Sequence, residues 1–484
     1  MTTPDPHRTA LHLVGGEHLD AGQLVDVTDP ATGRAIGRAC RVSGEEAVQL
    51  ARRAAETAAA AQRAWAETSP RSRAKILHDG ASLLAERAEE IALTLALEAG
   101  KRLPEARGEV AGSAEYLTWF AEEIRRPRGE YFTSEDPARR QLSMHRPLGV
   151  VATLTPWNFP VSIQARKVAP ALAAGNTVVA RVSEKAPLAV TRWLSTLHEA
   201  GLPDGVLNIV HGAAGTITET WTSHEAVRGV SFTGSTAVGS RVLGQAANRI
   251  VRPMMELGGD AAFIVAEDAD MDIALTQAEL GKLRNTGQSC IGINRFLVHR
   301  SRAEEFSERL AARFDELTIG PGTADPLPDL GPVIDTSRVQ EVTALVDDAV
   351  ERGARRLTAP RELPAQGTWL APTLLADVPL DARIAREEVF GPAAAIFVVD
   401  TDEEAISLAN STEMGLASYV VTQDAGRAFR YAERLETGIV GINDALPTVA
   451  FTPMGGTKQS GLGREGGTEG LREFQETTYV AWRP

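Results

Sequence analysis

Short apolar segments alternate with amphipathic segments from about residue 150 onward, and this alternation constrains the fold more than any other feature of the chain. The apolar segments resemble buried strands, whereas the amphipathic ones space their apolar residues at helical intervals. Strands that alternate with helices of this length form parallel sheets with helical crossovers. The pattern predicts strands at 150–154, 177–181, 206–210, 229–233 and 261–265, and helices at 162–174 and 188–200.

Other regions flank this alternation. Residues 44–126 show helical periodicity, and the strand–helix pattern that starts near residue 261 continues to about residue 450. The polar segment 127–144 contains two prolines and alternates weakly, so we expect a hairpin or an arm. A glycine-rich stretch, 455–467, precedes the C-terminal segment. The pattern alone predicts two α/β domains and a small accessory element.

Charge and cysteine content exclude several classes of protein. The 484 residues contain 50 Lys and Arg against 64 Asp and Glu, a net charge of −14 that gives no support for a basic nucleic-acid-binding surface. Cys40 and Cys290 are the two cysteines, too few for a disulfide framework, which favours a reducing compartment. The first 18 residues lack the features of a signal peptide, and no apolar run approaches the roughly 20 residues that span a bilayer. We therefore expect a cytoplasmic protein that binds neither nucleic acid nor membrane.

Ligands of parallel sheets bind at the carboxyl ends of the strands, so the loops after Leu154, Arg181 and Thr233 are candidate binding loops. Two prolines restrict the first loop and can fix the Asn158 amide as a donor to an oxyanion. An asparagine that only stabilises its loop is the alternative. After Thr233, Gly234 opens a predicted helix where backbone N–H groups can approach a phosphate. This loop is not a GxGxxG fingerprint, and glycines needed for packing alone explain it equally well.

Three further residues have side chains that can take part in catalysis. Cys290 lies in a loop of small residues, Glu256 precedes two glycines, and Glu388 lies in an acidic loop. A thiol can be a nucleophile and a carboxylate can activate water, but inert buried cysteines and solvated glutamates are common alternatives. The chain has no HExxH, CxxC or GxSxG motif, so we predict no metal site and no hydrolase nucleophile elbow.

Five motifs in order, TPWNFP, FTGSTAVG, ELGG, GQSC and EEVFGP, together with Glu98-Ala-Gly-Lys101, resemble the aldehyde dehydrogenase superfamily over nearly the whole chain. The resemblance implies an α/β fold with a Rossmann-like NAD(P)-binding domain, an α/β catalytic domain and a small β oligomerisation element. It assigns residues 1–126 and 145–256 to the NAD-binding domain, 257–453 to the catalytic domain, and 127–144 with 454–484 to the oligomerisation element and C-terminal tail. A homodimer or homotetramer is expected.

The resemblance also implies roles at matching positions. Cys290 matches the nucleophile, Asn158 the oxyanion donor, Glu256 the base that activates water, and Glu465 a tail carboxylate proposed as a proton relay. Glu256 favours hydrolysis to a free acid over transfer to coenzyme A, and the absence of a histidine close after Cys290 in the sequence argues against a phosphorylating enzyme. The positions that match the cofactor site are Thr155, Pro156, Trp157, Arg181, Ser183, Glu184, Gly234, Ser235, Glu388 and Phe390.

The cofactor is expected to be NAD, with NADP possible. Family members usually carry a lysine where this chain has Arg181, and a guanidinium suits a phosphate well. Glu184 matches a carboxylate that binds the ribose hydroxyls and repels a 2′-phosphate. At an effective dielectric constant of about 20, two such charges about 4 Å apart repel by up to about 4 kcal/mol. The repulsion favours NAD.

Within the superfamily, the segments around Arg166 and Arg284 look most like the succinate-semialdehyde dehydrogenases, in which arginines at these positions bind the distal carboxylate of the substrate. Thr448 matches a serine that adds a third contact. Pro447, Val449 and Phe451 replace smaller or more polar residues, so a broad-specificity dehydrogenase of aliphatic or aromatic aldehydes is the alternative. A catalytically silent family member is a second alternative, which the presence of Cys290, Glu256 and Asn158 opposes.

Overall fold

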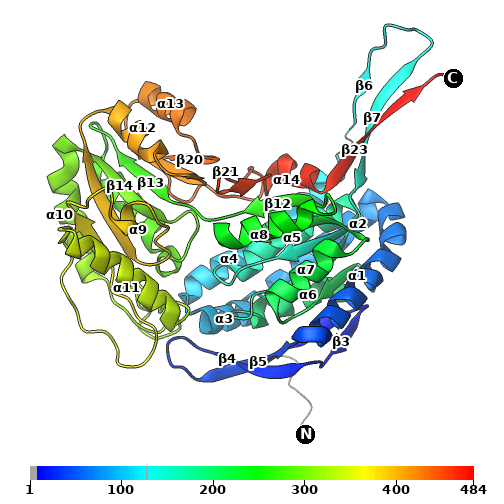
Figure 1. Cartoon of the computed structure of the whole chain (residues 1–484), viewed down its shortest axis with the longest axis horizontal. Coiled ribbons are helices and arrows are strands. Elements are labelled where there is room, and N and C mark those ends of the chain that lie inside the picture. The colour runs from blue at the N-terminus through cyan, green and yellow to red at the C-terminus, as the bar shows by residue number, and fades with distance from the viewer. Residues whose placement is uncertain (1–7, 127–128) are drawn as a thin grey trace.

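The computed structural model describes residues 8–126 and 129–484 and shows two large sheets with an arm that projects from one end (Figure 1). The N-terminal segment in which we predict no signal peptide begins with residues 1–7, and the predicted arm begins with 127–128. Both of these stretches lie outside the described residues.

The first sheet has eight strands in the spatial order β22 (Gly461–Leu462), β12 (Arg252–Glu256), β11 (Val227–Thr233), β8 (Val150–Leu154), β9 (Thr177–Arg181), β10 (Leu207–Ile209), β2 (His12–Val14) and β3 (Glu17–Leu19). The strands from β12 to β10 run parallel, which confirms the prediction from the alternating pattern. The chain continues from β8 to β9 on one side and returns as β11 on the other. A crevice for ligands forms where the strand order reverses in this way, here at the carboxyl end of β8.

Helices pack against this sheet (Figure 1). Pro70 begins α2 behind a Ser69 cap, and Gly100 ends α3 in the left-handed region, so the predicted helical stretch 44–126 divides into separate helices. Across residues 8–126 and 129–484, every helix falls short of the length or apolar character that a membrane crossing demands. The helices of this half are α1 (Gly44–Glu67), α2 (Pro70–Glu86), α3 (Ala88–Ala99), α4 (Leu103–Glu123), α5 (Pro160–Ala174), α6 (Leu188–Glu199), α7 (Ala214–Ser223) and α8 (Thr236–Ala247).

The second sheet has seven strands, β15 (Arg355–Arg356), β16 (Thr373–Ala376), β17 (Ala393–Val399), β14 (Ile293–His299), β13 (Ala261–Val265), β19 (Ala417–Val421) and β20 (Ile439–Ile442). All neighbours except β15 and β16 are parallel. Separate apolar clusters pack on its two faces, which explains the nearly continuous apolar character of its strands. Its helices are α9 (Met271–Leu283), α10 (Arg300–Glu316), α11 (Thr336–Glu351), α12 (Asp402–Asn410) and α13 (Ala425–Arg434).

The arm is a three-stranded antiparallel sheet of β6 (Tyr131–Phe132), β7 (Arg140–Pro147) and the C-terminal strand β23 (Gln475–Trp482), as expected from the sequence (Figure 1). It extends away from the rest of the chain. The smaller remaining elements are the sheet of β1 (Thr9–Ala10), β5 (Ala35–Arg41) and β4 (Gln23–Thr28), the pair β18 (Met414–Gly415) and β21 (Thr457–Lys458), and the helix α14 (Gly467–Glu473).

Three details differ from the sequence-based expectations. Glu256 ends strand β12 rather than lying in a small-residue turn, because Arg252-Pro-Met-Met-Glu256 pairs with β11 despite its proline. β7 continues to Pro147 and pairs there with Gln475, so the predicted boundary at 144 falls inside a strand. The segment 454–484 also contributes to three sheets, because β21 pairs with β18, β22 with β12, and only β23 with the arm.

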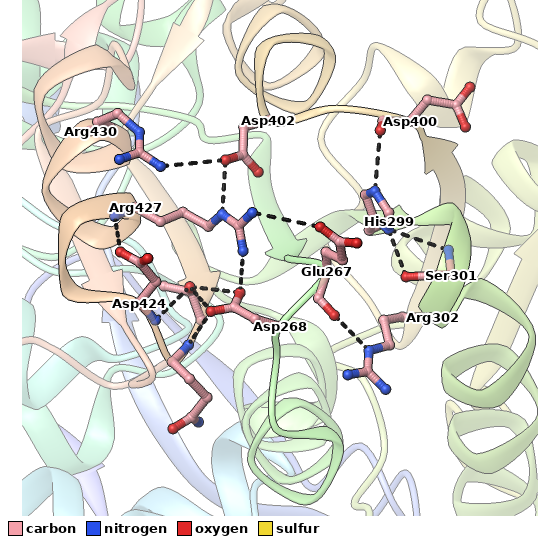
Figure 2. A network of polar contacts seen from close by, with 12 residues as sticks. Glu267, Asp268, His299, Ser301, Arg302, Asp400, Asp402, Asp424, Arg427 and Arg430 are labelled. Atoms are coloured by element: carbon pink, nitrogen blue, oxygen red, sulfur yellow. Dashed lines mark hydrogen bonds and ion pairs between the residues drawn. The ribbon is translucent and has the colours of Figure 1, made fainter.

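A polar network ties the carboxyl end of the second sheet to two helices (Figure 2). Arg427, near the start of α13, contacts Asp268 after β13 at 2.5 Å and Asp402 at the start of α12 at 2.8 Å. Asp268 also accepts hydrogen bonds from the Thr422 hydroxyl. The side chain of Arg427 is largely shielded from solvent, and its ion pairs join segments that are distant in the sequence.

Replacing Arg427 by alanine is expected to lower the free energy of unfolding by roughly 2 kcal/mol, since it leaves two carboxylates without their shared cation. Urea unfolding followed by circular dichroism measures this loss. The matched control is Arg430→Ala, because Arg430 is more exposed and reaches Asp402 only at 3.9 Å. Equal destabilisation by both substitutions would contradict the assigned role of Arg427.

Candidate active site

Cys290 lies between the two sheets, in a loop that follows α9 and has unusual backbone geometry. Asn285 and Thr286 adopt left-handed conformations with φ of 52° and 54°. Gly287, with φ of 75°, approaches the Gly391 carbonyl so closely that a Cβ would lie 2.2 Å from that oxygen. The glycine at position 287 is therefore required by close backbone packing. Strain of this kind is often retained at functional sites.

A buried network joins the cysteine loop to the loop after β8. Lys101 is fully buried, forms an ion pair with Glu109, and donates to the Asn158 carbonyl at 2.8 Å. Asn285 donates from its side-chain amide to the same carbonyl at 3.0 Å and to the Gln288 carbonyl at 3.3 Å. Glu109 also accepts from the first backbone N–H groups of α5. These contacts hold the two loops in one relative position.

The side-chain amide of Asn158 points toward the cysteine loop, where it donates to the Gln288 carbonyl at 3.1 Å. One N–H of this amide is therefore hydrogen-bonded within the protein. The amide carries a second N–H, which can serve an oxyanion. Its Oδ1 atom is buried and has no hydrogen-bond partner within the described residues. The sequence-based expectation of a restrained amide fits this geometry, and its role at an oxyanion stays a prediction.

Glu256 is buried at the end of β12, and its Oε2 atom has no hydrogen-bond partner in the described part of the chain. Burial and the nearby Glu465 carboxylate raise the pKa of Glu256 well above its usual value, although Lys167 and Arg166 act in the opposite direction. Lys167 donates to Glu465 at 2.6 Å and to the Ser231 hydroxyl at 2.9 Å. The raised pKa makes the Glu256 carboxylate a stronger base than an ordinary glutamate.

The thiol of Cys290 is only partly exposed, and desolvation raises its pKa to about 12. Arg166 lowers this pKa, whereas Glu388, Glu256 and Glu465 raise it further. A thiol in these surroundings is mostly protonated at neutral pH. Attack on a carbonyl therefore requires that the thiol first loses its proton.

One face of Cys290 opens into a cavity of about 410 Å³. All three residues predicted to bind substrate, Arg166, Arg284 and Thr448, line it together with Cys290, Phe159 and Tyr116. The guanidinium of Arg284 lies over the Phe159 ring at 4.9 Å from its centroid. The structure thus brings together residues from α5, α9 and the loop after β20, as the sequence predicts.

A second cleft of about 270 Å³ reaches Cys290 from the carboxyl end of β8. Residues predicted to bind the cofactor line it: Pro156, Trp157, Gly234, Ser235, Glu388 and Phe390. Trp157 and Phe390 contact each other edge to face, with centroids 5.6 Å apart. A Cβ on Gly234 would lie 2.5 Å from the Phe232 ring, and the Thr155 and Thr233 hydroxyls are buried without hydrogen-bond partners among the described residues. A glycine cradle at a helix start with unsatisfied hydroxyls fits a dinucleotide.

The remaining predicted cofactor residues lie farther along the same edge of the sheet, after β9. The Thr155 amide donates to the Arg181 carbonyl at 3.2 Å, so the two loops adjoin. The Ser183 hydroxyl accepts from the Lys185 amide at 3.3 Å. Glu184 forms ion pairs with Arg181 at 3.4 Å and with Arg41 at 3.2 Å. Its carboxylate is therefore paired with two cations, whereas the sequence-based preference for NAD treats it as an isolated negative charge.

Two clefts that meet at one cysteine, one of them shaped for a dinucleotide, suggest a redox enzyme, and comparison with known proteins supports this. Residues 18–480 match the profile of the aldehyde dehydrogenase family. The chain belongs to this family. Its members oxidise aldehydes with NAD or NADP, and this chain is a non-phosphorylating, NAD(P)-dependent aldehyde dehydrogenase. The α/β fold predicted from the sequence is confirmed.

Several of the similar relatives are named as semialdehyde dehydrogenases. This aldehyde dehydrogenase is 45% identical to a succinate-semialdehyde dehydrogenase of Paenarthrobacter nicotinovorans over 88% of the chain and 95% of the relative. It is 40% identical to a glutarate-semialdehyde dehydrogenase of Pseudomonas putida over 96% of each sequence. The crystal structure of succinate-semialdehyde dehydrogenase from Burkholderia pseudomallei superposes with a TM-score of 0.95 at 39% identity, covering 100% of both chains.

Sequence reasoning did not predict several residues of this site. Lys101, Glu109 and Asn285 fasten the loops around Cys290, and Arg338 lines the cofactor cleft over the Phe390 ring. Lys101 belongs to one of the motifs that carry the family resemblance, which was the available signal. Its contact with Asn158 spans 57 positions in the sequence and has no local pattern.

Proposed function

We propose that this aldehyde dehydrogenase oxidises an aldehyde that bears a distal carboxylate, such as succinate semialdehyde or a slightly longer semialdehyde. The observation that carries the proposal is Arg284. Among the described residues it makes no ion pair, although it faces the cavity that contains Cys290. A partly shielded guanidinium without an anion suits a substrate carboxylate, which it can bind through two parallel hydrogen bonds.

Arg166 is the second cation of this cavity. It lies 3.5 Å from Glu465, and its Nε atom is buried without a hydrogen bond among the described residues. Glu465 is shared with Lys167, so Arg166 keeps unsatisfied donor capacity. Thr448 adds a hydroxyl to the cavity wall. The similarity to relatives named for succinate and glutarate semialdehydes supports the same substrate class.

In the proposed reaction, the Cys290 thiol loses its proton to solvent, and the sulfur attacks the aldehyde carbon to form a thiohemiacetal oxyanion. The oxyanion accepts hydrogen bonds from the Asn158 side chain, whose amide carries a second N–H besides the one bonded to the Gln288 carbonyl, and from the Cys290 backbone amide. NAD or NADP, when bound, supplies the hydride acceptor, and Cys290 then carries a thioester. Trp157, Glu388 and Phe390 would hold the nicotinamide half, with Gly234 and Ser235 near the pyrophosphate.

Glu256 completes the proposed reaction. Its carboxylate removes a proton from water, and the water oxygen attacks the thioester carbonyl. The bond to sulfur then breaks and releases the carboxylic acid, and the proton held by Glu256 passes to the sulfur, which restores the Cys290 thiol and the Glu256 carboxylate. The raised pKa of Glu256 makes its carboxylate a stronger base than an ordinary glutamate.

A broad-specificity aldehyde dehydrogenase is the second candidate function, which the apolar rim of the cavity favours. Leu280 is exposed and lines the cavity together with Leu446, and the exposed Val449 and Phe451 follow the lining residue Thr448 in the chain. An aldehyde without a carboxylate could bury apolar surface there. The two proposals differ in whether a distal charge matters to catalysis.

Replacing Arg284 by alanine distinguishes them. We expect kcat/KM for succinate semialdehyde to fall by about 10-fold to 100-fold, the worth of a charge-assisted hydrogen bond, while kcat/KM for butanal changes little. The matched control is Arg102→Ala, because Arg102 lines the same cavity but is paired with Glu105 at 3.8 Å. If both aldehydes lose activity equally, the carboxylate site is wrong and the broad-specificity enzyme is favoured.

The domain division of the family is proposed for this chain as well, with 1–126 and 145–256 binding NAD(P) and 257–453 carrying the catalytic cysteine. Residues 127–144 and the C-terminal strand would mediate a homodimer or homotetramer. Exposed Tyr131, Tyr479 and Trp482 on the arm support self-association there. A reducing, cytoplasmic setting is also proposed, since both cysteines are free thiols.

A further inference from the structure

The end of strand β5 is fixed against the loop that follows β10. Val42 forms a bridge with Gly212, and the Ala213 amide donates to the Val42 carbonyl at 3.0 Å. Gly212 has φ of 136°, and a Cβ there would lie 2.2 Å from the Val42 oxygen. This close packing determines where the preceding residue, Arg41, projects. It brings a cation from the N-terminal segment to the edge of the first sheet where the loop after β9 lies.

At that edge Arg41 and Arg181 share one carboxylate. Arg41 Nη2 lies 3.2 Å from Glu184 Oε2, and Arg181 Nη2 lies 3.4 Å from Glu184 Oε1. Arg181 also donates to the Gly212 carbonyl at 3.3 Å. Two guanidinium groups around one carboxylate leave a local charge of +1, so the environment differs from the anionic one expected from Glu184 alone.

The two arginines differ in freedom. The side chain of Arg181 is 14% exposed and held by two partners, whereas that of Arg41 is 49% exposed and has Glu184 as its ion-pair partner within the described residues. Arg41 can therefore turn from Glu184 toward a new anion at little cost. A phosphate on the 2′ position of the adenosine ribose would be such an anion, because Glu184 matches the residue expected at the ribose hydroxyls.

We propose that Arg41 is a cofactor-specificity residue whose guanidinium offsets the Glu184 carboxylate and binds the 2′-phosphate, so that the protein accepts NADP as well as NAD. The proposal rests on the proposed function, and on the match of Glu184 to the carboxylate that the family resemblance places at the adenosine ribose. It does not depend on the aldehyde. Arg41 lies about 140 positions before the loop on which cofactor choice was predicted, and it reaches that loop only through the fold.

Calorimetric titration of two nucleotides that differ only in the 2′-phosphate tests the proposal, with adenosine 5′-monophosphate and adenosine 2′,5′-bisphosphate as probes. Arg41→Ala is expected to weaken binding of the bisphosphate about tenfold and to change binding of the monophosphate by less than about twofold. Arg41→Lys should retain part of the bisphosphate affinity. Glu184→Gln should strengthen bisphosphate binding, because it removes the negative charge.

Arg38→Ala is the matched control, because Arg38 lies on the same strand but is 63% exposed and paired with Asp26 at 3.7 Å. It removes the same charge and should leave both affinities within about twofold. Equal losses for both nucleotides in Arg41→Ala, no loss for either, or the same selective loss in Arg38→Ala would overturn the proposal. Since no aldehyde is present, a wrong substrate assignment leaves these results unchanged.

Discussion

Replacing Cys290 by serine is expected to reduce steady-state NADH formation from succinate semialdehyde by at least about 10⁴-fold, the scale of losing a covalent nucleophile. A serine hydroxyl is a far weaker nucleophile than a thiol and is even harder to ionise. The surroundings of Cys290 already disfavour its thiolate, since burial and three carboxylates raise its pKa. The remaining groups of the site do not replace the sulfur. Absorbance at the NADH maximum follows the reaction.

The second cysteine supplies the control for this experiment. Cys40 is buried on strand β5 near Asp20, and burial raises the pKa of its thiol to about 11. Cys40→Ser should leave kcat and KM close to those of the unmodified protein. NADH production that survives in Cys290→Ser, with normal binding of NAD, would refute the thiol mechanism.

Glu256→Gln is expected to separate the two halves of the reaction. NADH should still form in a burst of about one equivalent per active site, because hydride transfer precedes hydrolysis, while the steady-state rate should fall by about 10²-fold to 10⁴-fold. Glutamine is nearly isosteric and cannot accept a proton from water. Stopped-flow absorbance resolves the burst from the steady state. A variant that shows neither burst nor turnover would place Glu256 in thiol activation instead.

The pH dependence of the unmodified enzyme follows from the same residue. Glu256 acts as a base only when ionised, and burial with Glu465 nearby raises its pKa well above that of an ordinary glutamate. Hydrolysis of the thioester should therefore increase as pH rises through this raised pKa. When the pH is lowered, hydrolysis should be lost at a higher pH than for a base with the pKa of an ordinary glutamate. In Glu256→Gln the corresponding inflection in kcat should disappear. An unchanged inflection would assign it to another group.

Much of the fold was predictable because its signals are local. The strands at 150–154, 177–181 and 261–265 coincide with β8, β9 and β13, since buried parallel strands read as short apolar runs. Strand β12 was not predicted, because Pro253 and the two methionines give no periodicity and the strand is defined by its pairing with β11. The extent of β7 depends on β23, more than 300 positions away, and no local pattern encodes that pairing.

The site shows the same division. Cys290, Glu256 and Asn158 lie in motifs that the sequence displays directly. Lys101 and Arg41 act through contacts that only the fold creates, with Asn158 in one case and Glu184 in the other. The sequence therefore predicts the reacting groups, whereas the structure shows the charges around them. Electrostatic partners are set by distance in space rather than by spacing along the chain.

The most direct test of the central claim is the mass of the protein after a single turnover. Glu256→Gln is mixed with succinate semialdehyde and NAD, quenched in acid within the burst, and digested for mass spectrometry. The Cys290 thioester mechanism predicts one succinyl group on the peptide that contains Cys290, and none on the peptide that contains Cys40. NADH formation without an acyl group on Cys290, or an acyl group on another residue, would contradict it.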